Sequence, residues 1–445
     1  MRTSLLLLPL LIFRAQSTPI PFESVSGDKL WISSSPKASP ENHKPFRITV
    51  WFDKQLLGDS AAYQRRAKEF SKAKRTQLRT EVIAALKKES SLAFDKAAPT
   101  LKDLKQKGLI SDIDPHWIVN GFTCSTQEKG IQAISKLSGV RKIFIRQPRD
   151  IPVSKTPPMP KIPFVARPRK ANPKNIPWYT TKLEADKVWR ELGFAGQGTL
   201  NVIHDKNFIV SDHLQRSIYR NPKEIAGNGK DDDGNGFVDD VHGYNFDLQS
   251  NQLYTRPFTG NPKDRKILHG TNCANIVSGS GDGKDRPAFG IAPLSQWAGV
   301  INLGGIEQSV EWAIEQGADT YSMSFTRTPF SCIGSVTWAT EHYRDGTLQK
   351  PEVCAFNAKV VSQFLNGKIV PGLLNGNSYA GPMFCGAISL MLSADPDLLP
   401  SDLKEIITDT ATDVGPEGID PQTGHGLINC YKAVKEVQQR KQLRK

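Results

Sequence analysis

Residues 46–150 show an alternation of strand-like and helix-like patterns. The stretch FRITVWF at residues 46–52 is short, apolar and β-branched, which is typical of a strand. Taken together, the patterns predict strands at residues 46–52, 117–123 and 140–145, and helices at residues 77–105 and 126–137. Strand, helix, strand, helix, strand is the order of a split βαβ unit, so we expect a small α+β domain of the ferredoxin-like type.

Strand-like and helix-like pieces also alternate between residue 178 and about residue 437. TLNVIHD is a strand of the buried type, and HGTNCANIVSG has the small residues of a closely packed helix. The patterns predict strands at residues 199–205, 296–303 and 318–325, and helices at residues 269–279, 307–316 and 378–393. This βα alternation predicts an α/β fold with a mostly parallel sheet and helices on both faces.

The first 17 residues have the pattern of a secretory signal peptide. Arg2 provides a short positive region, Leu5 to Phe13 form an apolar core, and Ala15 and Ser17 are small residues at plausible cleavage positions. The apolar core is too short to cross a bilayer as a helix, and no later segment is long and apolar enough. We therefore expect export to an extracellular or periplasmic location, with no membrane partner. A buried N-terminal helix is the alternative.

Residues 151–177 are rich in proline and basic residues and contain no acidic residue. Proline-rich chain is extended and exposed, which predicts a linker open to proteolysis. An uncleaved spacer is the alternative interpretation. A short basic tail is predicted at residues 438–445.

Charge is divided unevenly between the two predicted domains. Residues 1–175 contain 32 Lys and Arg against 14 Asp and Glu, a net +18, and residues 176–445 contain 26 against 31, a net −5. The opposite signs predict that the two parts of the chain bind each other. Nucleic acid is not expected as a partner, because the larger part is acidic and no basic motif is interleaved with aromatic residues.

Three polar residues stand where an open α/β sheet presents functional groups. Asp205 ends the strand at 199–205, His269 opens one predicted helix, and Ser378 opens another among small residues in NGNSYAGPM. A serine hydroxyl needs a base to become nucleophilic, a neutral histidine is such a base, and a carboxylate orients the histidine. The three residues therefore predict nucleophilic catalysis.

In these motifs the sequence resembles the subtilisin-like serine proteases, the subtilases. TLNVIHD resembles the strand that leads to the family's catalytic aspartate, HGTNCANIVSG its histidine motif, and GNSYAGPMFCGAISLML its serine motif. The resemblance implies that Asp205 orients His269, that His269 is the general base and that Ser378 is the nucleophile. It also implies a peptidase domain at 178–437 that acts on peptides or proteins. Residues 46–150 would then be a propeptide that acts as a folding chaperone and intramolecular inhibitor.

The sequence departs from the family pattern between the histidine and the serine. Only 109 positions (378 − 269) separate His269 from Ser378, and the family's Ala-Gly-Asn loop, whose asparagine donates to the oxyanion, is not found. Asn377 also stands where the family has threonine. The leading interpretation is a secreted serine endopeptidase made as a zymogen. The alternatives are a non-catalytic homologue that binds peptides or a protein partner, and the product of an incomplete gene.

The acidic stretch GNGKDDDGNGFVDDVHGYNF at residues 227–246 resembles half of a calcium-binding loop. Oxygen-bearing side chains occupy positions 1, 3 and 5 of the loop, a glycine occupies position 6, and His242 occupies position 12 in place of the usual glutamate. The predicted ligands of a structural calcium ion are Asp231, Asp233, Asn235 and Asp239. An acidic, solvated loop is the alternative.

Overall fold

The computed structural model describes residues 31–32, 45–56, 74–146, 176–210, 212–254, 268–280, 290–303, 305–324, 351–357, 363–365, 368–370 and 376–444. The predicted signal peptide and nearly all of the predicted linker lie outside these residues. The chain divides into two compact units, which are described separately. The first comprises residues 1–53, 95–114 and 121–148, and the second comprises residues 54–94, 115–120 and 149–445.

The first unit is built on a five-stranded sheet. The strand order is β1-β5-β2-β4-β3, with bounds β1 Trp31–Ile32, β2 Phe46–Phe52, β3 Ile110–His116, β4 Gly121–Thr126 and β5 Val140–Arg146. The central strand β2 pairs antiparallel with both β4 and β5. Ile48, Val50 and Phe122 are fully buried and form part of its core. Its helices are α3 (Glu128–Ile134) and the C-terminal part of α2 (Arg75–Gln106).

The strand predicted at residues 117–123 is largely a turn. Residues 117–120 connect β3 to β4, and Asn120 has a φ of 35° immediately before Gly121. Asn-Gly is a preferred pair for tight turns because both residues tolerate positive φ. The prediction is wrong at these four positions because the Asn-Gly turn, and not the apolar run before it, determines the backbone here.

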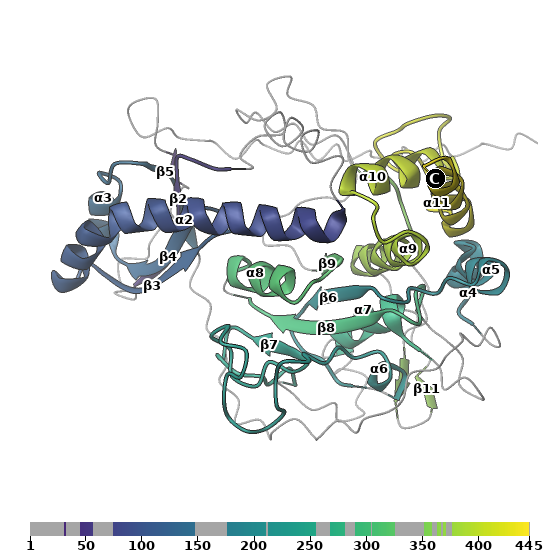
Figure 1. Cartoon of the computed structure of the whole chain (residues 1–445), viewed down its shortest axis with the longest axis horizontal. Helices are drawn as coiled ribbons and strands as arrows, with labels where there is room; N and C mark the ends of the chain where they lie inside the picture. The colour runs from purple at the N-terminus through teal and green to yellow at the C-terminus, as the bar shows by residue number, and fades with distance from the viewer. Residues whose placement is uncertain are drawn as a thin grey trace, which may run out of the picture. The chain divides into compact units, whose positions relative to one another are not determined.

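The second unit contains a four-stranded parallel sheet in the order β7-β8-β6-β9 (Figure 1). The strands are β7 Gly243–Asn245, β8 Gln296–Ile301, β6 Leu200–His204 and β9 Thr320–Met323. Every residue of β6 is buried. Parallel strands covered on both faces have this continuous apolar character.

Helices cover both faces of this sheet, as two consecutive residues of β6 show. Ile203 belongs to a core cluster with residues of α7 (His269–Ser278) and α9 (Ala380–Ala394). Val202 points to the opposite face, where it clusters with Trp312 of α8 (Glu307–Glu315). The predicted α/β architecture is therefore confirmed. Within the described ranges the other α-helices are α4 (Trp178–Lys182), α5 (Ala185–Lys187), α6 (Asp212–Gln215), α10 (Pro400–Asp409) and α11 (Cys430–Leu443). The strands β10 (Gln363–Leu365) and β11 (Lys368–Val370) form a separate antiparallel pair.

Two predicted boundaries differ from the structure. Most of the predicted basic tail forms the last turns of α11, where Arg440 pairs with Glu436 at 2.8 Å and Glu405 at 3.0 Å. Ser378 lies in a 3₁₀ turn, Asn377–Tyr379, and the α-helix begins after it at Ala380. Within the described part of the chain, no helix is both long and apolar enough to span a membrane.

The second unit also contains residues 54–94 and 115–120 of the predicted propeptide, which contact α8 and the segment after it. Glu311 accepts hydrogen bonds from the backbone N–H groups of Trp117 (2.5 Å) and Ile118 (2.9 Å). Arg75 pairs with Asp319 at 2.7 Å, just beyond the end of α8. In each contact a carboxylate of the acidic half meets donors from the basic half, which agrees with the charge pattern along the chain.

Candidate active site

The carboxyl end of β6 holds Asp205. It follows the last strand residue directly, its side chain is almost fully buried, and its backbone N–H donates to the carbonyl oxygen of Val300 in β8 at 3.0 Å. One carboxylate oxygen, Oδ1, accepts the N–H of Lys206 at 2.8 Å. These bonds fix the carboxylate at the sheet edge where the strands of α/β folds present functional groups.

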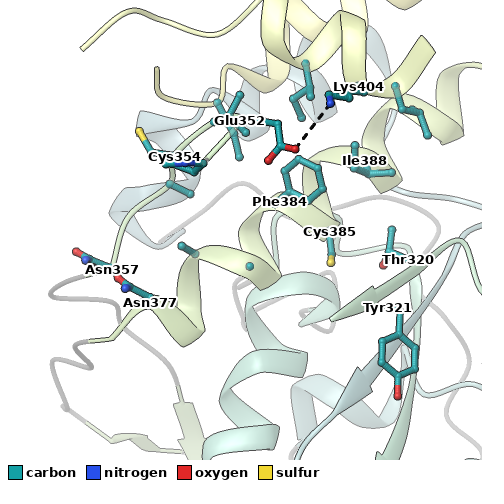
Figure 2. A pocket seen from close by; sticks show the side chains of 18 of the residues that line it. Thr320, Tyr321, Glu352, Cys354, Asn357, Asn377, Phe384, Cys385, Ile388 and Lys404 are labelled. Carbon is teal, nitrogen blue, oxygen red and sulfur yellow. Dashed lines mark hydrogen bonds and ion pairs between the residues drawn. The ribbon is translucent and has the colours of Figure 1, made fainter. Parts of the chain in front are cut away.

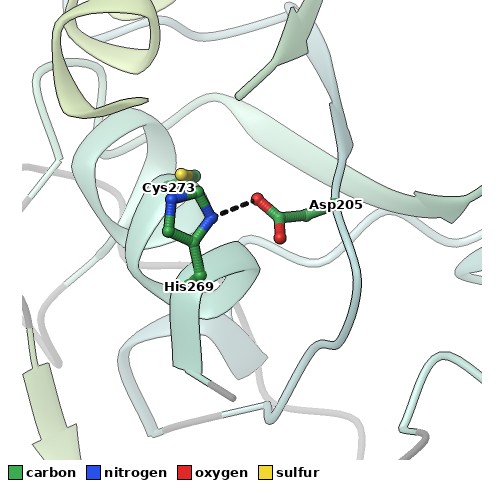
Figure 3. Close-up of side chains that lie close together, drawn as sticks. All are labelled: Asp205, His269 and Cys273. Atoms are coloured by element: carbon green, nitrogen blue, oxygen red, sulfur yellow. Dashed lines mark hydrogen bonds and ion pairs between the residues drawn. The ribbon is translucent and has the colours of Figure 1, made fainter. Parts of the chain in front are cut away.

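His269, the first residue of α7, hydrogen-bonds to Asp205. Its Nδ1 lies 2.7 Å from Asp205 Oδ2, as the dashed line in Figure 3 shows. The imidazole is about a quarter exposed, whereas the carboxylate is buried. With Nδ1 facing a carboxylate, the proton is placed on Nδ1 and the other nitrogen, Nε2, is available as a base.

Gly270 allows this close approach. A Cβ at this position would lie 2.7 Å from the carbonyl oxygen of Asn207 and 2.8 Å from the Cβ of Asp205. Non-bonded carbon and oxygen atoms do not approach so closely, so any larger residue would push α7 away from the strand end. The glycine after the histidine is therefore required by packing as well as by the motif.

Ser378 is tied to the end of β9 by two hydrogen bonds with Ser324. The Ser378 hydroxyl donates to the carbonyl oxygen of Ser324 at 3.2 Å, and the Ser324 hydroxyl donates to the carbonyl oxygen of Ser378 at 2.9 Å. Tyr379 lies with its ring 5.6 Å from the ring of His269. The structure thus brings the serine turn to the histidine, with the Ser378 hydroxyl directed at Ser324 in this conformation.

Cys273 lies one helical turn after His269, beside the imidazole ring (Figure 3). Its Sγ donates to the carbonyl oxygen of Ser378 at 3.6 Å, and ligand atoms of Cys273, His269 and Asp205 all lie within 4.8 Å of one another. Such a set suits a thiophilic cation only after the thiol loses its proton. Because burial raises the pKa of this thiol well above its ordinary value, the neutral group packs against the serine turn. Cys273 and Ser324 were not singled out from the sequence.

A pocket of about 800 Å³ adjoins the serine turn. Figure 2 shows it between β9, residues 351–357, α9 and α10, with the ion pair of Glu352 and Lys404 at its rim, 3.8 Å apart. Asn377 and Ala380, on either side of Ser378 and Tyr379, are among its lining residues. The interior is mainly apolar, with Phe384, Ile388, Leu403 and Ile407 among the lining side chains.

Two asparagine side chains meet beside Ser378. Asn357 Nδ2 donates to Asn377 Oδ1 at 2.8 Å, and Figure 2 shows the two side chains next to each other. This contact uses the carbonyl side of the Asn377 amide and leaves its NH₂ group as a donor next to the serine. Residues 325–350, where the family's oxyanion loop would be expected, lie outside the described residues.

The predicted calcium ligands lie in one loop but make different contacts. Asp231 and Asp233 lie close together, and Glu224, which is not among the predicted ligands, lies beside them. Asp239 instead accepts the backbone N–H groups of Gly227 and Gly229. His242 is not part of this group of carboxylates, and its Nδ1 lies 2.6 Å from the carbonyl oxygen of Tyr219. Proximity in sequence alone could not identify Glu224, because the loop folds back to reach it.

Comparison with known proteins agrees with these motifs. Residues 203–358 and 370–426 match the Subtilase family, a range that includes all three predicted catalytic residues. Bacillopeptidase F of Bacillus subtilis is 21% identical over 492 aligned positions, covering 91% of this chain and 32% of that protein. The Halolysin-like extracellular serine protease Nep of Natrialba magadii is 26% identical over 211 positions, covering 37% of this chain and 38% of that protein.

The chain spans about a third of the length of the curated relatives that it matches. Among solved structures, fervidolysin from Fervidobacterium pennivorans, described as a keratinolytic enzyme related to subtilisin, superposes with a TM-score of 0.50 at 13% identity. That match covers 94% of this chain and 64% of fervidolysin, and at this identity it shows the fold alone. The family match and the fold agree with the sequence motifs, and residues 203–426 of the chain contain a subtilase family domain.

Proposed function

We propose that this protein is a subtilisin-like serine endopeptidase that hydrolyses peptide bonds. The observation that carries the proposal is the 2.7 Å contact between His269 Nδ1 and Asp205 Oδ2, next to the turn that holds Ser378. His269 would take the Ser378 proton at Nε2 as the hydroxyl attacks the peptide carbonyl. Asp205 would hold the ring and stabilise the imidazolium, and His269 would then return the proton to the leaving amine.

The first step requires a rotation of the Ser378 side chain. Its hydroxyl now donates to the Ser324 carbonyl, so it must turn from that oxygen towards His269. Rotation about one side-chain bond between staggered positions is fast compared with enzyme turnover. Ser324 would keep its own hydrogen bond to the Ser378 carbonyl during this change and so hold the turn in place.

Two donors are proposed for the negative charge that develops on the substrate oxygen. One is the backbone N–H of Ser378, at the start of the 3₁₀ turn that continues into α9, where the positive end of the helix dipole also lies. The other is the side-chain NH₂ group of Asn377, which Asn357 orients. This arrangement would take the place of the asparagine loop that the sequence lacks. The neighbouring apolar pocket would receive an apolar part of the peptide.

We further propose that the enzyme is secreted as a zymogen. The sequence features that support this are the signal-like N-terminus, the proline-rich linker and the basic segment before it. A relative described as extracellular is consistent with this location. Residues 46–150 would act as the inhibitory propeptide until cleavage in or near residues 151–177.

The test is hydrolysis of a set of internally quenched peptides by the purified protein. We expect turnover by the wild type, and loss of turnover by at least about 10³-fold in Ser378→Ala and in His269→Ala. Peptides that are cleaved within the chain, not at an end, would identify an endopeptidase. Absence of turnover by folded protein from which the predicted propeptide has been removed would contradict the proposal.

A binding role without catalysis is the second candidate. The hydrogen bond from Ser378 to Ser324, instead of to His269, is the observation that favours it. In that case the protein would bind the same peptides without cleaving them, and Ser378→Ala would bind as well as the wild type. The turnover measurement separates the two candidates directly.

A further inference from the structure

Asn357 is joined at two points to the chain just before Ser378. Its side-chain Nδ2 donates to Asn377 Oδ1 at 2.8 Å, and its carbonyl oxygen accepts the backbone N–H of Gly376 at 2.7 Å (Figure 2). In the proposed function the NH₂ group of Asn377 is a donor to the oxyanion, so the position of Asn357 determines where that donor lies. The contacts that hold Asn357 therefore bear on catalysis.

The segment that leads to Asn357 is anchored at Cys354. The N–H of Cys354 donates to the carbonyl oxygen of Gly426 at 2.8 Å, and the carbonyl oxygen of Cys354 accepts the N–H of Ile428 at 3.1 Å. Asn357 itself is exposed, as is Asn377, so water can compete for the hydrogen bond between their side chains. Packing near Asn357 is therefore needed to keep the two amides in place.

Phe356, the residue before Asn357, packs against Trp178. The two ring centroids are 4.7 Å apart and the ring planes are inclined by 61°, which is the edge-to-face arrangement that aromatic pairs prefer. Phe356 is half-buried and packs against the core of the second unit. The ring of Trp178 also lies 6.1 Å from that of Tyr179, which is fully buried in the same core. Trp178, although 37% exposed, is thus placed to hold Phe356 against the core.

We propose that Trp178 is a positioning residue for the oxyanion donor. Its contact with Phe356 fixes the backbone at Asn357, and Asn357 in turn orients the amide of Asn377 beside the serine. The proposal rests on the proposed function, because it explains how the donor that replaces the missing asparagine loop is supported. The predicted linker ends at residue 177, so cleavage within the linker leaves Trp178 attached to the peptidase domain.

Nuclear magnetic resonance of the full-length chain, labelled with ¹⁵N-asparagine, tests these contacts without requiring turnover. The protein carries Ser378→Ala, and the side-chain NH₂ signals are assigned from their loss in Asn357→Ala and Asn377→Ala. We expect Trp178→Ala to shift both sets of signals and to speed hydrogen exchange of the Asn357 NH₂ group with water. Trp178→Phe, which keeps an aromatic ring, should leave them nearly in place. Unchanged signals in folded Trp178→Ala would overturn the proposal, whether or not the wild type is an enzyme.

Peptide hydrolysis provides the functional test. Trp178→Ala should lower kcat by about tenfold and change KM by less than about twofold, because an oxyanion donor acts in the transition state. Trp178→Phe should recover most of this loss. In the Asn377→Ala background, Trp178→Ala should lower kcat by less than about twofold further, because the donor that it positions is already absent. A further tenfold loss in that background would mean that Trp178 acts by another route. A wild type without turnover would contradict the proposed function, and the resonance measurement would still decide the role of Trp178.

Tyr431→Ala is the matched control. Tyr431 is a partly buried aromatic residue that packs against the same core, but its ring lies below the ammonium groups of Lys187 and Lys435, at 5.7 and 5.0 Å. Its loss should leave kcat within about twofold of the wild type and the asparagine signals in place, because distant sites act independently. Equal losses of kcat in Trp178→Ala and Tyr431→Ala would show a general loosening of the fold and would overturn the positioning role.

Discussion

At the scale of single residues, the site depends on how closely α7 approaches the end of β6. His269 can reach Asp205 at 2.7 Å only because the next residue has no side chain. Gly270 therefore contributes to the chemistry through packing, although it has no functional group. The same approach places Cys273 under the serine turn, where its thiol donates to the Ser378 carbonyl.

Gly270→Ala should greatly reduce activity. The new methyl group would meet Asn207 O at 2.7 Å and Asp205 Cβ at 2.8 Å, so the helix must shift and the contact between His269 and Asp205 must lengthen. Displacements of about 1 Å in an active site cost roughly 10²-fold in rate. The measurement is kcat/KM for a quenched peptide, with circular dichroism to confirm folding.

Gly381→Ala is the control for this variant. An added Cβ at Gly381 meets no atom closer than Ser322 Oγ at 3.9 Å, an ordinary contact distance. Its kcat should remain within about threefold of the wild type because no neighbouring atom has to move, and any effect should fall on KM because Gly381 lines the pocket. Equal activity of Gly270→Ala and Gly381→Ala would show that the approach of α7 is not limiting.

Asn377→Ala should lower kcat with much less effect on KM. If the Asn377 NH₂ group stabilises the oxyanion, it acts mainly in the transition state, and its loss costs roughly 10²–10³ in kcat. Asn357→Ala removes only the group that orients Asn377 and should cost less. An unchanged kcat in Asn377→Ala would remove this residue from the mechanism.

At the scale of elements, most of the strands and helices of the second unit were predictable from their patterns. The predicted strand at residues 199–205 is β6, and the predicted helix at 269–279 is α7, because a buried parallel strand is continuously apolar and a closely packed helix has small residues. Contacts between distant segments were not predictable. Ser324 contacts Ser378, and Glu224 lies close to Asp231, because the folded chain brings these separate segments together. No sequence pattern indicates either pairing.

The segment that enters β7 should make the protein sensitive to acid. Burial lowers the pKa of His242 to about 4, and its Nδ1 faces the Tyr219 carbonyl oxygen at 2.6 Å. Since the folded pKa lies below the unfolded value of about 6.5, the neutral form is favoured by folding. The neutral His242 side chain contributes its full stabilisation of the folded state above pH 6.5, and this contribution is lost as the pH falls towards 4. From this difference in pKa the loss is about 3 kcal/mol.

His242→Gln tests this pH dependence. Glutamine can still donate to Tyr219 but does not titrate. In the Ser378→Ala background, urea unfolding at several pH values should show a steeper loss of stability in the parent than in the variant between about pH 6.5 and 4. Parallel stability curves would mean that His242 is not the group responsible.

At the scale of the whole molecule, a buried carboxylate of α8 binds a segment of the predicted propeptide within the second unit. Glu311 is only 8% exposed and accepts the N–H groups of Trp117 and Ile118. Because this carboxylate is buried, water cannot replace it as the acceptor for the two N–H groups. The contact therefore contributes more to stability than a surface ion pair does. The net charges of +18 and −5 on the two parts of the chain agree with such a contact.

Glu311→Ala should therefore shorten the delay before proteolytic activity appears. Loss of a charged acceptor for two backbone donors costs about 1.5–3 kcal/mol, so the cleaved propeptide would dissociate sooner. The measurement is the time course of peptide hydrolysis after secretion or refolding. Glu315→Ala is the matched control on α8, since its partner Lys87 is half-exposed and a solvent-accessible ion pair should contribute little. Identical delays in both variants would argue against this contact as part of the inhibition.

Covalent labelling of the purified protein with a fluorophosphonate probe tests whether His269 and Asp205 activate Ser378. We expect that the wild type is labelled at Ser378, that Ser378→Ala is not labelled, and that His269→Ala is labelled much more slowly because it lacks the base. Folded wild-type protein that remains unlabelled after removal of the predicted propeptide would contradict the claim that His269 and Asp205 activate Ser378.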